Sequence, residues 1–136
     1  MRIAILPALL LAAGAAHAAE TLERPVLEGD WVPLSKAAES ITGPLRLTAG
    51  AITFEGAEPL PIEPVESGPQ GTLYRVTAPR RVALRNGNTI CPGPVTYLRV
   101  TPQAAGDGAF AFFETQDRPT DRDRSTCLWS VYVKQQ

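Results

Sequence analysis

The sequence predicts an all-β domain, either a small antiparallel barrel of about eight strands or a sandwich, with one short helix. Turn-forming combinations of Gly, Pro and Asn divide the chain into short runs at roughly ten-residue spacing. Most of these runs are rich in β-branched and aromatic residues, as strands are. We favour the barrel, since closure of a sheet removes its exposed edges.

Residues 1–18 have the features of a secretory signal peptide. One basic residue precedes the apolar run Ile3–Ala16, and Ala16-His17-Ala18 is a small-x-small cleavage site. No cysteine follows that site to accept a lipid, and no later apolar run has the length of a transmembrane helix. We therefore expect a product in the periplasm, or a secreted one, without a membrane anchor after cleavage.

A single β domain should follow the signal peptide, because roughly 118 residues make one domain of ordinary size. Residues 19–29 are polar and aperiodic, which is typical of a flexible N-terminal arm. The domain proper then spans residues 30–136, and we find no internal repeat in it.

The helix is expected at Ser35–Ile41, with Ser35 as its N-cap and Gly43-Pro44 as its stop. The alternating pairs Leu45/Leu47 and Ile52/Phe54 then predict a hairpin with one buried face. Three prolines confine the next run, around Ile62 and Val65, to a sheet edge or an irregular connection. Further strands are expected at Leu73–Thr77, Val82–Leu84, Val95–Thr101, Ala109–Phe113 and Leu128–Val133.

The last predicted strand, Leu128–Val133, has apolar residues at both alternating sets of positions. A strand of this kind is typically covered on both faces.

Cys91 and Cys127 are the only cysteines, and an even number in an exported domain predicts a disulfide. The bond would close a loop of about 37 residues and stabilise the fold by roughly 3 to 4 kcal/mol on the chain-entropy model. A redox or nucleophilic role is disfavoured, since there is no Cys-x-x-Cys pattern and no histidine base in the mature chain.

The charge and histidine content exclude several classes of function. The formal net charge is −1 and charges of both signs are interspersed, so no nucleic-acid partner is expected. The only histidine, His17, is lost with the signal peptide, which disfavours an enzyme. No cofactor motif is present. The calcium-like spacing Asp121-x-Asp123-x-Ser125 lacks the required glycine and is interleaved with arginines, so no metal is expected.

Four arginines form a cluster that could bind an anion or a partner, or could instead be the outward face of a hairpin. They are Arg75, Arg80, Arg81 and Arg85. The carboxylate pairs Glu55/Glu58 and Glu63/Glu66 could in principle support acid-base hydrolysis, which requires a shared buried cleft.

Seven aromatic residues could either fill the core of a barrel or line a pocket for one small apolar ligand. We favour filling, given the size of the domain. The residues are Trp31, Phe54, Tyr74, Tyr97, Phe110, Phe112 and Trp129.

The segment Gly29-Asp30-Trp31 resembles the Gly-x-Trp signature that opens lipocalin-type (calycin) barrels. The resemblance implies a basic residue that closes over Trp31, for which Arg124 is a candidate. The chain is also similar to compact periplasmic protease inhibitors, which combine an exported eight-stranded barrel, a flexible arm and one disulfide. Those inhibitors place the bridge in the first half of the domain, whereas Cys91 and Cys127 lie in the second. The cysteine segments also resemble those of exported proteobacterial proteins.

The sequence thus favours a non-enzymatic exported binding module, which inhibits or docks onto a periplasmic protein through the arm at 19–29 or a loop. The alternative is a carrier of a small apolar ligand inside the barrel. A hydrolase that uses carboxylates or a serine is a third hypothesis.

Overall fold

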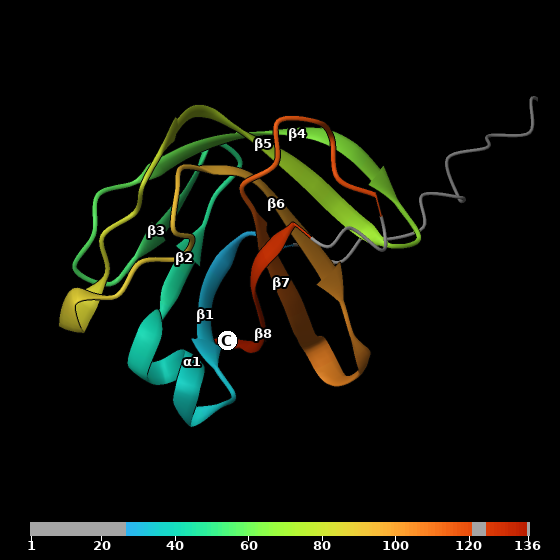
Figure 1. The fold of residues 1–136 in the computed structure, drawn as a ribbon. Coiled ribbons are helices and arrows are strands. Elements are labelled where there is room, and N and C mark those ends of the chain that lie inside the picture. The colour runs from blue at the N-terminus through green and yellow to red at the C-terminus, as the bar shows by residue number, and fades with distance from the viewer. Residues whose placement is uncertain (1–26, 121–124, 136) are drawn as a thin grey trace, which may run out of the picture.

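The computed structural model describes residues 27–120 and 125–135, and these form a closed eight-stranded antiparallel barrel with one short helix (Figure 1). The strands follow one another around the barrel in sequence order, and β8 pairs with β1 to close it. The predicted barrel is confirmed over the sandwich. The strands are β1 (Gly29–Pro33), β2 (Leu45–Leu47), β3 (Ala51–Phe54), β4 (Leu60–Gly68), β5 (Gly71–Arg80), β6 (Val95–Pro102), β7 (Asp107–Phe113) and β8 (Thr126–Lys134).

The predicted helix is α1 (Lys36–Ile41), which lies at one end of the barrel beside β1 (Figure 1). Ser35 caps it as expected, since its hydroxyl accepts a hydrogen bond of 3.0 Å from the Ala38 backbone N–H. Gly43 ends the segment in a left-handed conformation with φ of 61°.

The predicted hairpin β2–β3 is confirmed, with Leu45 opposite Phe54 and Leu47 opposite Ile52. These four side chains alternate with more exposed ones and are buried inside the barrel. The same alternation in the other strands directs the large apolar side chains into one shared core.

The expectation of an irregular connection around Ile62 is wrong, because β4 is a nine-residue strand paired with β3 at Leu60 and Pro61 and with β5 from Ile62 onward. Beyond Ile62 its ladder runs to β5 alone, as at the expected sheet edge. Its pairing with β3 ends near Ile62, where the backbone N–H donates to the Gly50 carbonyl. Pro64 follows, beside a bulge in the β5 pairing. The missing N–H of Pro64 therefore falls where β4 extends beyond β3, and costs no ladder hydrogen bond.

The predicted strand at Val82–Leu84 is also not found. This segment makes one isolated bridge, Ala83 to Thr89, across a turn (η2, Arg85–Gly87) in which Asn86 and Gly87 have positive φ. With a single bridging pair, the segment is a loop rather than a strand of the barrel. A second turn, η3 (Ala104–Gly106), joins β6 to β7.

The predicted disulfide is confirmed between Cys91 and Cys127, whose Cα atoms are 5.3 Å apart. Cys91 lies in the β5–β6 connection, and Cys127 is the second residue of β8. The bond therefore ties this connection to the start of the strand that closes the barrel.

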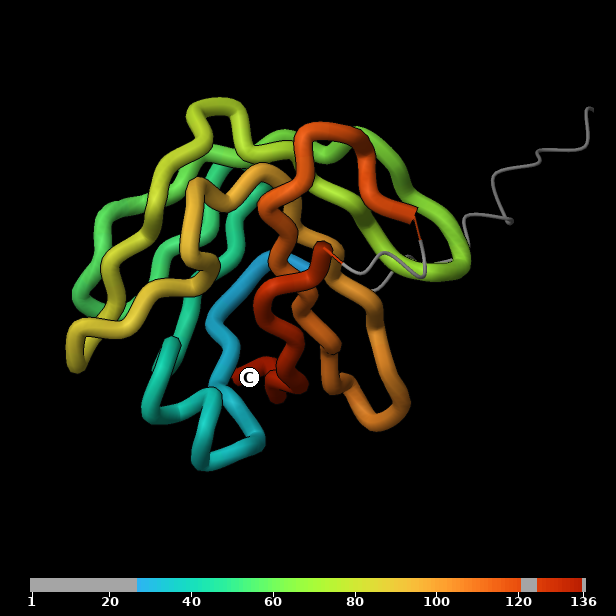
Figure 2. The backbone as a smooth tube through the Cα atoms, viewed as in Figure 1, coloured from blue at the N-terminus to red at the C-terminus, as the bar shows by residue number. Residues whose placement is uncertain are grey.

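The segment 114–120 between β7 and β8 passes over the outside of the barrel near β4 and β5 (Figure 2). Pro119 is buried there, and its carbonyl accepts a hydrogen bond of 3.3 Å from Arg99 Nη2. The Arg99 guanidinium also lies 5.8 Å from the centre of the Phe113 ring. Phe113 points outward, so the chain itself covers this apolar part of the outer surface.

The predicted signal peptide and most of the arm lie outside the described residues. Of the arm, Leu27 packs against the core, and its carbonyl accepts a hydrogen bond of 2.9 Å from Trp31 Nε1. Gly29 is the first residue of β1. The last three residues assigned to the arm are therefore part of the domain.

Candidate interaction surface

Five of the seven aromatic candidates lie inside the barrel and are buried: Trp31, Phe54, Tyr74, Phe110 and Phe112. The ring centres of Trp31 and Phe110 are 5.2 Å apart, and those of Phe54 and Phe112 are 5.6 Å apart. Both distances are typical of packed aromatic pairs. These five side chains fill the interior.

Tyr132 and Thr42 form a buried polar contact at the α1 end of the interior, which sequence analysis missed. The two hydroxyl oxygens are 2.7 Å apart, and the Thr42 hydroxyl donates to the Ala38 carbonyl at 3.0 Å. Burial raises the pKa of Tyr132, and the hydrogen bond with Thr42 opposes that shift. The pair joins β8 to the end of α1, and no buried side-chain polar atom of the described residues lacks a partner.

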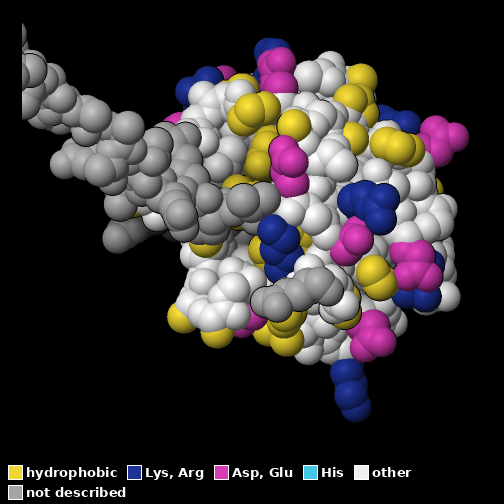
Figure 3. Space-filling model, turned by 180° about the vertical axis from the view of Figure 1, so that it is seen from behind, with side chains coloured by type: hydrophobic (Ala, Val, Ile, Leu, Met, Phe, Trp, Pro, Cys, Tyr) yellow, Lys and Arg dark blue, Asp and Glu magenta, His cyan; other side chains and the backbone are white. Residues whose placement is uncertain are grey.

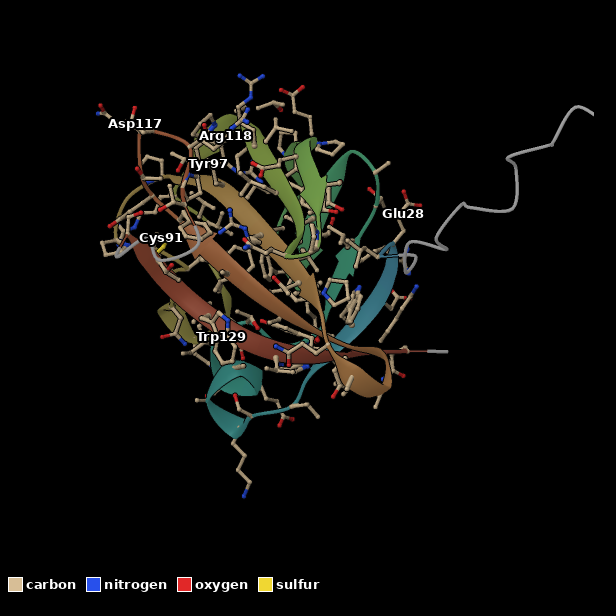
Figure 4. All side chains as sticks on the ribbon, turned by 90° about the vertical axis from the view of Figure 1, so that its right-hand side faces the viewer. Glu28, Cys91, Tyr97, Asp117, Arg118 and Trp129 are labelled. Carbon is tan, nitrogen blue, oxygen red and sulfur yellow. A yellow bond between two sulfur atoms is a disulfide. The ribbon has the colours of Figure 1, made fainter. Side chains whose placement is uncertain are left out.

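The remaining two aromatic candidates are on the outside of the barrel. Tyr97 is half-buried on β6, across from Phe113. Trp129 on β8 is 59% exposed, so the expected core or pocket role for it needs correction. In Figure 4 the Trp129 side chain lies on the outer side of β8, near α1.

The four candidate arginines do not converge on a common point. Arg75 forms an ion pair with Glu63 on the neighbouring strand β4. Arg80 and Arg85 lie 3.7 Å and 3.8 Å from carboxylate oxygens of Glu58 and Glu55, respectively. Arg81 is exposed and has no ion-pair partner among the described residues.

The same ion pairs account for the candidate carboxylates. Glu55, Glu58, Glu63 and Glu66 each face a different arginine, the last being Arg118 at 3.9 Å. All four side chains are substantially exposed, and no two of them line the same hollow. Within the described ranges no group of His, Cys, Asp and Glu could hold a metal ion. Asp121, Asp123 and Arg124 lie outside those ranges.

Much of the outer surface of β2–β5, with the adjoining part of β1, is covered by such charge pairs. Asp30 and Arg46, which face outward from β1 and β2, are 2.7 Å apart. The Arg46 hydrogen bond lowers the pKa of Asp30. We call this side, with the pairs Asp30–Arg46 and Glu63–Arg75, the charged face. Figure 3 shows basic and acidic side chains interspersed over the back of the molecule, without a large area of one sign.

The outer surface of β7, β8 and the end of β1 is different, because its outward residues are apolar except for Asp107 at its rim. Register places Ala109 opposite Val131, Ala111 opposite Trp129 and Val32 opposite Val133. The Leu34 N–H donates to the Val131 carbonyl at 3.0 Å, which places Leu34 beside that row. We call this surface the apolar face; it consists of Val32, Leu34, Ala109, Ala111, Trp129, Val131 and Val133, of which Ala109 is buried and the others are partly or largely exposed.

Trp129 and Leu34 are the two large hydrophobic residues that the described part of the chain exposes, at 59% and 58%. Both belong to the apolar face. The sequence contained the signal, since Leu128–Val133 is apolar at both sets of alternating positions. That pattern predicts a strand covered on both faces, but nothing among the described residues covers Trp129.

Comparisons with protein-family models, with curated proteins and with solved structures found no match for this chain. No helix within the described residues is long and apolar enough to cross a membrane. The account of function therefore rests on the barrel and its two outer faces.

Proposed function

We propose that this protein is an exported, non-enzymatic binding module that docks onto another polypeptide through the apolar face. The observation that carries the proposal is the exposure of Trp129 and Leu34 side by side with smaller apolar residues on one sheet surface. Contiguous exposed apolar patches of soluble proteins commonly mark interaction sites. Tryptophan is also the residue most enriched at energetic centres of interfaces.

The rest of the molecule supports a binding role over catalysis. The candidate carboxylates and most of the candidate arginines are exposed partners of one another, which is an arrangement typical of a solvated surface. Two buried tyrosines, Tyr74 and Tyr132, have pKa values raised mainly by burial, and both belong to the packed core. Such shifts need no catalytic role.

A carrier of a small apolar ligand is less well supported. A ligand inside the barrel would need the space that Trp31, Phe54, Phe110, Phe112 and Tyr132 occupy. In a barrel of about eight strands the interior either is filled by side chains or holds one small ligand. Here the aromatic packing favours the first arrangement.

Export and the lipocalin-type resemblance are parts of the same proposal. The eight-stranded antiparallel barrel is compatible with that resemblance, and the disulfide is compatible with an oxidising compartment such as the periplasm. Inhibition of a periplasmic protease remains one form that docking could take, with the arm at 19–26 as a second contact.

The test is recovery of partners from the native periplasm with a tagged protein, quantified by mass spectrometry. We expect the double variant Leu34→Ser/Trp129→Ser to lose the specific partner, since it removes both exposed apolar side chains and leaves the core intact. Arg81→Ser, a change at another exposed residue away from the apolar face, should retain it. Equal recovery by both variants would overturn the proposal, and loss only on deletion of residues 19–26 would assign binding to the arm.

A further inference from the structure

We propose that the apolar face binds the apolar face of a second copy of this chain, in a twofold-symmetric dimer. This inference rests on the proposed function, because it names the polypeptide that docks on the same face. A twofold interface uses the same patch on both subunits, so the patch must be complementary to itself in shape and in charge.

Strand register arranges the face in three short rows across β7, β8 and the end of β1. Asp107, Val133 and Val32 form the first row. Ala109, Val131 and Leu34 form the second. Ala111 and Trp129 form the third, and α1, which begins at Lys36, follows Leu34 on that side (Figure 4).

The shape of this face is self-complementary because the protruding side chains lie next to small ones. Consider two such faces that cross at about a right angle, which is one of the two usual packings of sheets. With Val131 at the centre, a twofold axis in the plane of the interface places Trp129 of one copy over the Ala109 position of the other, where Ala109 is only 4% exposed and does not protrude. The same axis places Leu34 over Val133, so each protruding side chain meets a smaller one.

The charges at the rim of the face follow the same symmetry. Asp107 lies at the end of the first row, and Lys36 begins α1 beyond Leu34, so the order of the chain places the two at diagonally opposite corners. Lys36 also borders a hollow with Glu39 and Arg85, but neither Lys36 nor Asp107 has an ion-pair partner among the described residues. The axis that places Trp129 over Ala109 also brings Lys36 of each copy toward Asp107 of the other. Two equivalent ion pairs would then flank an uncharged centre, as in interfaces with a polar rim.

The size of the face predicts a weak dimer. Trp129 and Leu34 expose more than half of their surfaces, and with their neighbours they offer less area than the about 800 Å² per partner of a standard interface. We therefore expect a dissociation constant on the order of 10 to 100 µM, typical of small transient interfaces.

Sedimentation equilibrium of the oxidised mature protein tests both the dimer and its geometry through charge reversal. Lys36→Glu alone places two acidic residues together at both rim contacts, and Asp107→Lys alone places two basic residues together. Each single variant should weaken the homodimer by about tenfold or more. An equimolar mixture should recover the affinity of the natural protein, because the mixed dimer has an opposite-charge pair at both contacts.

Other results would overturn the inference. A natural protein that stays monomeric at 1 mM would contradict the dimer, and single variants that dimerise normally, or a mixture without recovery, would contradict this pairing. Circular dichroism of the variants controls for folding; both residues are at the ends of elements, so the barrel should be unchanged.

A second measurement separates failure of this inference from failure of the proposed function. Leu34 is replaced by p-benzoylphenylalanine, and the protein is irradiated in its native compartment. A cross-linked product of twice the chain mass supports the dimer. Cross-links exclusively to a different polypeptide would reject the second copy as occupant and retain the proposed function. Absence of any cross-link, together with a monomeric protein, would reject both.

Discussion

The charged face and the apolar face belong to the same barrel, and in both the side chains alternate between inward and outward positions. The two faces differ in the kind of residue at the outward positions. On the charged face, outward residues such as Glu63 and Arg75 pair across neighbouring strands. On the apolar face, the corresponding positions hold valine, alanine, leucine and tryptophan. The inward residues of both are largely buried. The difference therefore has no explanation in the core, and points to what each face meets outside the chain.

A third part of the outer surface makes this contrast sharper. Phe113 and Leu73 also face outward, and both are buried; the segment 114–120, with Arg99, lies over this part of the sheet. This protein thus covers outward apolar residues where it can do so with its own chain. Trp129 is left exposed by the described residues, and the proposed docking would cover it.

The change with the largest expected effect is a charge at the centre of the apolar face. Val131→Asp should weaken docking on this face by about 100-fold or more, because an unpaired carboxylate would be buried in the interface. The isosteric Val131→Thr should have a much smaller effect. Sedimentation equilibrium measures the affinity, and thermal unfolding reports whether each variant is folded. Equal affinities of the two variants would show that this position is outside the interface.

The next largest effect is expected from Trp129→Ser. Removal of an interface tryptophan commonly costs about 2 kcal/mol or more of binding free energy, which is roughly a 30-fold loss of affinity. The free energy of unfolding should change by only about 0.5 kcal/mol, because the side chain is 59% exposed in the folded monomer. Urea unfolding at low protein concentration gives the second quantity. A loss of several kcal/mol in stability would instead make Trp129 part of the folding core.

Smaller effects are expected on the charged face. Glu63→Gln and Arg75→Gln should each lower the free energy of unfolding by at most about 1 kcal/mol, since both side chains are about half exposed and screened by solvent. A double-mutant cycle in urea gives the interaction energy of the pair. Neither variant should alter association. A change in association as large as that of Trp129→Ser would remove the distinction between the faces.

The smallest effect concerns pH and the pair Asp30–Arg46. The pKa of Asp30 is lowered mainly by the Arg46 hydrogen bond, so its contribution to stability is present above the usual Asp pKa of about 3.9 and is lost as the pH falls below it. The natural protein should be slightly more stable than Asp30→Asn at pH 6, and the two should converge at about pH 2. Urea unfolding at both pH values measures this. A gap that widens on acidification would contradict the assigned sign.

The sequence predicted the architecture wherever an element depends on the apolar alternation and the turn residues of its own segment. The cap at Ser35, the hairpin of Leu45 with Phe54 and the strands β6 and β7 needed only alternation and punctuation. The run around Ile62 is predicted only in part: Pro64 lies where β4 continues beyond β3, as at an edge, but the start of β4 pairs with β3 despite Pro61.

The candidate site was less accessible from the sequence. The ion pair of Glu63 with Arg75 joins two neighbouring strands, and the positions of these residues in the sequence did not predict it. The apolar residues at both alternating sets of positions in β8 indicate that both faces of this strand are covered. They do not tell whether the chain itself or a partner covers the outer face. That distinction depends on where 114–120 crosses the barrel, which follows from tertiary packing.

The most direct test of the account uses the two tryptophans as probe and internal control. The indole N–H of Trp31 is buried and donates to the Leu27 carbonyl, whereas Trp129 is exposed on the apolar face. In a ¹H–¹⁵N NMR dilution series from 1 mM to 20 µM, we predict that the Trp129 indole signal and the amides of Val131 and Ala109 shift with concentration. The Trp31 indole and the amides of Arg46 and Arg75 should not shift. A spectrum unchanged throughout the series, or shifts confined to the charged face, would contradict self-docking through the apolar face.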